Sequence, residues 1–133
     1  MSRLLLSVFA FLGLLALAAP SNAHHSFIAT YFDDQRVQIE GTVVQFLLRN
    51  PHSFLHVEVE DANGAMQTWA IEWGAGSQLN GQGITPTSLK AGDHVVITGS
   101  PSRNPEDNRM RLITLSRPSD GLTWGRNQGE VVN

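Results

Sequence analysis

The sequence predicts an all-β fold, a small barrel of five antiparallel strands, and three observations predict it. Apolar and polar residues alternate with a period of two along five segments, which is typical of strands with one buried face. Glycine, proline, asparagine and aspartate separate these segments at short intervals. No segment after the N-terminal region shows the spacing of a long amphipathic helix, so strands must supply the core.

The N-terminal region differs from the rest of the chain and is predicted to be a secretory signal peptide, residues 1–23. Arg3 supplies a positive charge, residues 4–19 are almost entirely apolar, and residues 21–23 (SNA) fit the small-residue rule of a cleavage site. A membrane anchor is the alternative, but this apolar run is shorter than the roughly 20 residues of a spanning helix. We therefore expect a periplasmic or secreted mature chain, residues 24–133, without a membrane span.

The predicted mature chain keeps 110 of the 133 residues, with 8 Lys and Arg against 12 Asp and Glu, and no cysteine. Its formal charge of −4 argues against nucleic acid as a partner, because binding nucleic acid needs clustered basic residues. The absence of cysteine excludes disulfides, cysteine-ligated zinc and cysteine nucleophiles. We expect one domain held by packing alone, with residues 24–35 as an N-terminal arm and residues 117–133 as a C-terminal tail.

The first strand is predicted over residues 36–48 (RVQIEGTVVQFLL), because apolar side chains recur there at every second position. Its predicted buried face consists of Val37, Ile39, Gly41, Val43 and Leu47. A glycine within such a run marks a bend or bulge. Residues 49–51 (RNP) end the strand, because proline cannot donate to a strand ladder.

The second and third strands are predicted to form a hairpin around residues 61–64 (DANG), because Asn-Gly tolerates the positive φ of a tight turn. The predicted buried face of residues 52–60 is Leu55, Val57 and Val59, and in residues 66–73 Trp69, Ile71 and Trp73 share one face. Residues 74–86 are expected to be irregular, because four glycines disfavour a long helix.

One short helical turn is expected in residues 85–93, between the third and fourth strands. The fourth strand is predicted over residues 94–100, with Val95 and Ile97 buried, and the fifth over residues 109–116, with Leu112 buried. The order of three strands, a linker and two further strands matches that of the five-stranded Greek-key barrel called the OB-fold. An open β-sandwich is the alternative, but it usually needs about seven strands.

Several segments, taken in order, resemble a family of small exported proteobacterial proteins that is described as a domain of unknown function. The segments are AHHSF at 23–27, GTV at 41–43, NPHSFLHVEVED at 50–61, LKAGDHVVITG at 89–99 and RLITL at 111–115. The resemblance spans His24 to about Trp124 and implies an exported all-β domain. It implies no established activity and no catalytic residues, although its HHSF and NPH segments point to the histidines.

The N-terminal histidines are the leading candidates for a metal site. Cleavage after Ala23 gives His24 a free α-amine beside its imidazole, and amine and imidazole nitrogens suit Cu(II). We therefore predict a copper site at His24 and His25, to which His52 or His94 adds a nitrogen if the fold brings it near. The alternative is a solvated polar terminus, because a short histidine tract is only a compositional signal.

A metal-free interaction subunit is the alternative function. In that case outward-facing aromatic and polar side chains would bind a partner protein or a small ligand, and the candidates are Phe46, Phe54, His56, Trp69 and Trp73. His56 and His52 lie four residues apart, about 13 Å in an extended strand, so they cannot share one ion unless the chain bends.

An enzyme is not predicted, because the sequence contains no recognised hydrolase, metalloprotease or nucleotide-binding motif. A hydrolase that uses Glu58 or Asp33 is the third hypothesis. Both carboxylates lie in segments where acidic side chains are usually solvated.

Overall fold

The structure is a computed structural model, and it describes residues 24–125. The predicted signal peptide, residues 1–23, and the end of the tail, residues 126–133, lie outside the described residues. The side chains of residues 24–26 also lie outside what the structure describes. Within the described range, no helix is long and apolar enough to cross a membrane.

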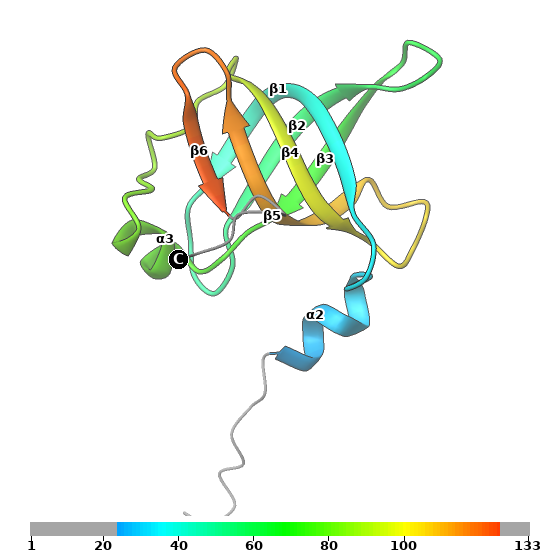
Figure 1. Cartoon of the computed structure of the whole chain (residues 1–133), viewed down its shortest axis with the longest axis horizontal. Coiled ribbons are helices and arrows are strands. Elements are labelled where there is room, and N and C mark those ends of the chain that lie inside the picture. Colours follow the sequence, from blue (N-terminus) through cyan, green and yellow to red (C-terminus); the bar gives the residue numbers. More distant parts are fainter. Residues whose placement is uncertain (1–23, 126–133) are drawn as a thin grey trace, which may run out of the picture.

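The described chain is mostly strand, with two short helices (Figure 1). The elements are α2 (His24–Thr30), β1 (Val37–Leu47), β2 (Phe54–Glu60), β3 (Met66–Glu72), α3 (Gly76–Gly81), β4 (His94–Pro101), β5 (Arg109–Arg117) and β6 (Leu122–Gly125). The five predicted strands are confirmed within one or two residues at most ends.

The sheet closes into a barrel of five strands, as predicted for an OB-like fold. The strand order is β3-β2-β1-β4-β5-β6, and an additional pairing between β3 and β5 closes the barrel. That pairing is parallel, from Ala70↔Arg109 to Glu72↔Arg111, whereas the other strand pairs are antiparallel. The reason is geometric: an odd number of strands cannot alternate direction all the way around a closed ring.

The long strand β1 crosses the barrel and pairs with β4 in its first half and with β2 in its second. Gly41 lies where it changes partner, and a Cβ atom there would lie 2.2 Å from the carbonyl oxygen of Glu58. Only glycine permits this approach of two backbones. The predicted irregularity is confirmed, with the register shift itself between Val43 and Gln45.

The predicted core is largely confirmed. Buried positions include Ile39, Val43, Leu55, Val57, Ile71, Val95, Ile97 and Leu112, while Val37 and Val59 are partly buried against them. The linker between β3 and β4 adds Leu79, Ile84 and Leu89, each at most 5 % exposed. This linker therefore closes one end of the barrel, because its apolar side chains fill the space that the strands leave open.

Two local predictions differ from the structure. The helix between β3 and β4 is α3, not a turn within residues 85–93, because Leu79 anchors α3 in the core while residues 85–93 form turns. Within the tail predicted over residues 117–133, residues 122–125 form β6, which pairs with β5 at Leu115↔Trp124. Alternation over only two apolar residues, Leu122 and Trp124, was too short to predict a strand.

Candidate functional site

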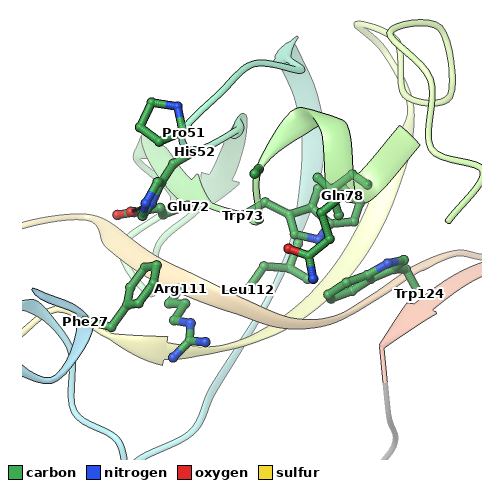
Figure 2. A pocket seen from close by; sticks show the side chains of 12 residues that line it. Phe27, Pro51, His52, Glu72, Trp73, Gln78, Arg111, Leu112 and Trp124 are labelled. Atoms are coloured by element: carbon green, nitrogen blue, oxygen red, sulfur yellow. Dashed lines mark hydrogen bonds and ion pairs between the residues drawn. The ribbon is translucent and has the colours of Figure 1, made fainter. Parts of the chain in front are cut away.

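A pocket of about 420 Å³ opens beside α3, and it is the best-formed candidate site in the described part of the chain. Its walls come from the β1–β2 loop, the end of β3, α3, β5 and β6, with Phe27 of α2 at the rim. This volume lies within the roughly 300–1,000 Å³ typical of small-molecule sites. Figure 2 shows His52, Glu72, Phe27 and Arg111 toward one end and Gln78 and Trp124 toward the other.

The polar end of the pocket is built around Glu72, which is 7 % exposed. Its Oε1 accepts a hydrogen bond from His52 Nδ1. Its Oε2 accepts one from the Tyr31 hydroxyl and one from Arg109 Nη2, the latter at 2.6 Å. Arg109 Nε also donates to the Tyr31 oxygen at 2.6 Å. We call these four residues the Glu72 cluster.

The Glu72 cluster fixes the protonation of its own members. Burial opposes the charged form of Glu72, but hydrogen bonds from Tyr31, Arg109 and His52 outweigh it and hold the pKa of the carboxyl below its usual value. An ionised carboxylate only accepts, so the hydrogen between it and His52 must lie on Nδ1. Burial and the bond to Glu72 raise the pKa of the Tyr31 hydroxyl well above its usual range, so Tyr31 remains a donor.

The His52 ring is held from two sides. Glu72 fixes its Nδ1, and Phe27 stacks on it with ring centroids 5.0 Å apart and planes 30° apart. Nε2 has no hydrogen-bond partner among the side chains that the structure describes. Arg111 lies on Phe27, with its guanidinium carbon 4.3 Å from the ring centroid. His52 therefore presents an oriented, unpaired nitrogen at the polar end of the pocket.

The other end of the pocket is aromatic. Trp73 packs edge to face on Trp124, with centroids 5.0 Å apart, and contacts Phe46 at 5.8 Å. Trp124 Nε1 donates to Gln82 Oε1 at 2.9 Å, whereas Trp73 Nε1 is buried and has no partner in the part of the chain described. Trp73 itself is 3 % exposed, so it belongs to the core and not to an outer face.

The predicted metal ligands do not gather at one place. His94 bonds Glu40 on an exposed part of the barrel, and its neighbour on β1 is Thr42. Leu47 of β1 pairs with Phe54, two residues after His52. The stretch of β1 between Thr42 and Leu47 spans about 16 Å, so the histidines at its two ends cannot share an ion. His24 and His25 begin α2, but their side chains lie outside the description.

The residues described contain no group of three His, Asp or Glu side chains that could hold a metal ion. The side chains of His24 and His25 are not described, so this absence does not extend to a site that they would form. The copper prediction at the N-terminus therefore remains a prediction.

The predicted ligand-binding residues are divided between different places. Trp73 lines the pocket, whereas half-buried Trp69 lines a separate hollow with Gln67 and Asn108. Phe54 lies beneath the guanidinium groups of Arg49 and Arg109, and half-buried His56 lies within β2 opposite Ala70 of β3. Glu58 and Asp33, proposed for a hydrolase, are exposed and do not line the pocket.

Sequence reasoning missed the residues that organise the site: Tyr31, Glu72, Gln78, Arg109, Arg111 and Trp124. Alternation in WAIEW points Glu72 away from the core, which would make it an ordinary solvated carboxylate. The outer face there is instead covered, because Tyr31 bridges to Ser102 and Arg109 enters from β5. No local sequence signal indicates that cover.

Comparisons with known proteins bear on the fold. The model of a family of unknown function, DUF6152, matches residues 11–111. A mitochondrial single-stranded DNA-binding protein from S. cerevisiae, Rim1, is 11 % identical, with a TM-score of 0.48 over 65 % of this chain and 95 % of that one. A small single-stranded DNA-binding protein from Streptomyces coelicolor is 14 % identical, with a TM-score of 0.39 over 65 % and 93 %. No curated protein matches the sequence.

The exclusion of nucleic acid as a partner is corrected: the solved structures similar to this chain include two single-stranded DNA-binding proteins, a likeness that concerns the fold alone. The exclusion relied on net charge, which sums over the whole chain and says nothing about local clustering. In the structure Arg49, Arg103, Arg109 and Arg111 each lie on an aromatic ring. One of them, Arg109, is also paired with Glu72.

Proposed function

The chain belongs to the DUF6152 family of unknown function, and from that premise we propose that it is an exported binding module that holds a small ligand in the pocket beside His52. The observation that supports the proposal is the pocket itself, with its oriented polar end and its aromatic end. Small-molecule sites combine apolar walls with a few polar groups in fixed positions.

The Glu72 cluster supports binding because it orients a group toward the pocket. Placing a carboxylate in a covered position is unfavourable unless partners compensate it. Here three donors compensate Glu72, and one of them, His52, also lines the cavity. Supporting a ligand-facing side chain through a second layer of hydrogen bonds is a common arrangement in binding sites.

Binding fits the pocket better than catalysis. No serine, threonine or cysteine with a described side chain lines it, and its carboxylate, Glu72, already accepts on both oxygens. A hydrolase would need a nucleophile or an activated water held between a base and an oxyanion site. His52 is a base in position, but the described lining offers no second reacting group.

Filling the pocket tests this function. In Gln78→Trp, a large side chain on α3 would occupy the cavity, whereas Asn80→Trp places the same side chain on the exposed part of the same helix. We expect compounds from a library of small acids, amines and neutral aromatics to bind the natural chain and the Asn80 variant. They should lose saturation-transfer NMR signals with the Gln78 variant. Equal signals from all three proteins would contradict the proposal.

Copper binding is a second candidate function, and one contact favours it. Phe27 stacks on His52, so α2, which begins at His24, is docked at the pocket. A histidine whose Nδ1 is held by a carboxylate is also typical of a metal ligand that binds through Nε2. We propose that the His24 amine and imidazole, with His25, bind Cu(II), and that His52 contributes the further nitrogen.

Copper titration by calorimetry tests this second candidate with matched variants. His24→Ala with His25→Ala should lose most of the affinity, and one extra residue before His24 should weaken binding by moving the amine. His52→Ala should weaken it further, whereas His94→Ala should not, because His94 pairs with Glu40 elsewhere on the barrel. The same affinity in every variant would rule out the N-terminal site.

A further inference from the structure

Two hydrogen-bond donors in the lining of the pocket have no partner among the described side chains. Glu72, the carboxylate in the lining, accepts from three donors and has little capacity left for a ligand. The Arg111 side chain has no ion pair or hydrogen bond among the described side chains, and it contacts the Phe27 ring. Trp73 Nε1 is likewise unpaired. The pocket therefore offers two unpaired donors, the Arg111 guanidinium and Trp73 Nε1, and a ligand that bonds to both must bring acceptors.

The unpaired charge of Arg111 favours an anion at the polar end. A guanidinium presents two parallel N–H groups, which match the two oxygens of a carboxylate. One guanidinium supplies one positive charge, and the ionised Glu72 lies in the same lining. A dianion such as a phosphate monoester would be repelled by Glu72 more strongly than a carboxylate would.

The middle of the pocket favours a flat apolar body. Leu79 and Leu112 are buried side chains of its wall, and Trp124 closes it from β6. Trp73 and Trp124 meet at 74°, so one indole offers its face where the other offers its edge. Aromatic ligands stack well against such surfaces, and they lose little conformational freedom on binding.

Trp73 Nε1 indicates a second acceptor on the ligand. This residue is 3 % exposed, and its indole N–H has no partner in the described residues, although buried N–H groups are normally bonded. Figure 2 shows Trp73 in the wall between His52 and Trp124, next to Gln78. The indole of Trp124 shows the ordinary situation, because it donates to Gln82. A ligand oxygen would accept the hydrogen bond that Trp73 Nε1 can donate.

We infer that the pocket binds a small aromatic carboxylate, with the carboxylate on Arg111 and a hydrogen-bond acceptor at the opposite end of the ring on Trp73 Nε1. This inference rests on the proposed ligand-binding function and names the ligand class. His52 lies at the carboxylate end of the pocket.

Three probes of nearly equal size separate the two contacts. 4-Methoxybenzoate carries both features, 4-methoxybenzamide lacks the charge, and 4-ethylbenzoate lacks the ether oxygen. By calorimetry at neutral pH, 4-methoxybenzoate should bind about tenfold more tightly than the amide, because a charge-assisted pair is replaced by neutral bonds. It should bind several-fold more tightly than 4-ethylbenzoate, because one hydrogen bond is lost.

Variants assign the contacts. Arg111→Gln should remove the preference for the benzoate over the benzamide. Arg103→Gln should keep it, because Arg103 lies on Phe32 outside the pocket. In ¹⁵N-labelled protein, the indole signal of Trp73 should shift with 4-methoxybenzoate and much less with 4-ethylbenzoate. Trp69 lines the separate hollow, so its indole signal should stay in place.

The outcomes separate this inference from the function on which it rests. Equal affinities for the benzoate and the benzamide would overturn the carboxylate assignment while leaving a pocket that binds aromatic compounds. An unchanged Trp73 signal with a preserved charge preference would overturn the second contact. If no probe bound and the compound library also gave no signal blocked by Gln78→Trp, both the inference and the proposed function would fail.

Discussion

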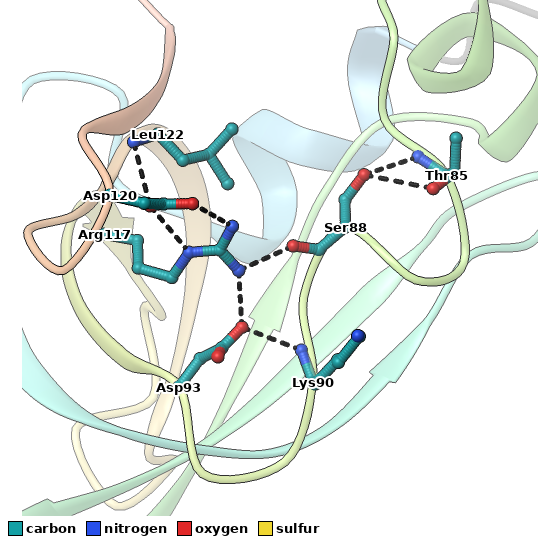
Figure 3. A network of polar contacts seen from close by, with 7 residues as sticks. All are labelled: Thr85, Ser88, Lys90, Asp93, Arg117, Asp120 and Leu122. Atoms are coloured by element: carbon teal, nitrogen blue, oxygen red, sulfur yellow. Dashed lines mark hydrogen bonds and ion pairs between the residues drawn. The ribbon is translucent and has the colours of Figure 1, made fainter.

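Two polar clusters at opposite ends of β5 have similar chemistry and different surroundings. The Glu72 cluster is centred on a carboxylate, and the second is centred on Arg117 (Figure 3). Arg117 donates to Asp93 at 2.6 Å, to the Ser88 carbonyl at 2.7 Å and to Asp120 at 3.0 and 2.8 Å. We call Ser88, Asp93, Arg117 and Asp120 the Arg117 cluster.

The Arg117 cluster closes on itself. Asp93 also accepts from the Lys90 backbone, and Asp120 accepts from the Leu122 backbone, so each carboxylate ties a turn to Arg117. The hydrogen bonds to Asp120 and Asp93 raise the pKa of Arg117 above its usual range. The backbone bond from Lys90, with help from Arg117, lowers the pKa of Asp93, although burial opposes this. The result is a clamp between the linker before β4 and the β5–β6 turn.

The Glu72 cluster differs in what it leaves open. It lies beside a cavity, and the Nε2 atom of His52 has no partner in the described residues. The Asp120 side chain is 53 % exposed, whereas that of Glu72 is 9 % exposed. A closed network near solvent holds loops together, whereas a covered network that orients an unpaired group toward a cavity is a candidate site. The following predictions test that distinction.

The largest expected effect is that of Glu72→Gln. The substitution keeps the shape but removes the charge that pairs with Arg109 and accepts from Tyr31 and His52, so the domain should lose about 3 kcal/mol of stability. Urea denaturation measures the change. Glu58→Gln, on an exposed position of β2, is the control and should change stability little. Equal losses of stability in the two variants would show that the contacts of Glu72 do not stabilise the fold.

Lowering the pH should destabilise the domain through the same carboxylate, Glu72, by less than the substitution does. The pKa of Glu72 is lower in the folded state than its usual value of 4.5. Its contribution to stability is therefore fully present above that value and is lost as the pH falls through the folded pKa. Urea midpoints from pH 7 to pH 3 should fall less steeply in Glu72→Gln than in the natural chain. Parallel curves would contradict the assignment.

Arg117→Gln should have an intermediate effect, about 1 kcal/mol, because the cluster is partly exposed and water replaces its bonds. Lys90→Gln is the matched control, since Lys90 enters the cluster through its backbone and its side chain is exposed. Ligand binding in the pocket should be unaffected by Arg117→Gln. A loss of binding would show that the clamp and the pocket are coupled.

Salt should produce the smallest difference. Raising NaCl from 0.1 to 1 M shortens the screening length from about 10 to 3 Å, which weakens exposed pairs more than covered ones. The stability difference between the natural chain and Arg117→Gln should shrink by a few tenths of a kcal/mol. The difference caused by Glu72→Gln should remain. If salt instead reduced the stability difference caused by Glu72→Gln and left that of Arg117→Gln unchanged, water would reach Glu72 more freely than Arg117.

The sequence alone predicted the strands, the turns and most of the core. Alternation places Leu55 and Val57 inward whatever the rest of the chain does, because successive side chains on a strand point to opposite faces. Asn63 and Gly64 mark a turn for an equally local reason, and Gly64 adopts φ of 80°. These features depend on residues that are neighbours along the chain, so a local pattern is sufficient to predict them.

The candidate site was decided only by the tertiary structure. Tyr31, His52, Glu72 and Arg109 come from the arm, a loop and two strands, and they meet because β3 and β5 pair at the parallel seam that closes the barrel. Glu72 alternates outward like any solvated acid, and its role depends on what covers that face. Hydrogen bonds between distant segments have no periodicity in sequence, because they depend on how the strands register around the closed barrel.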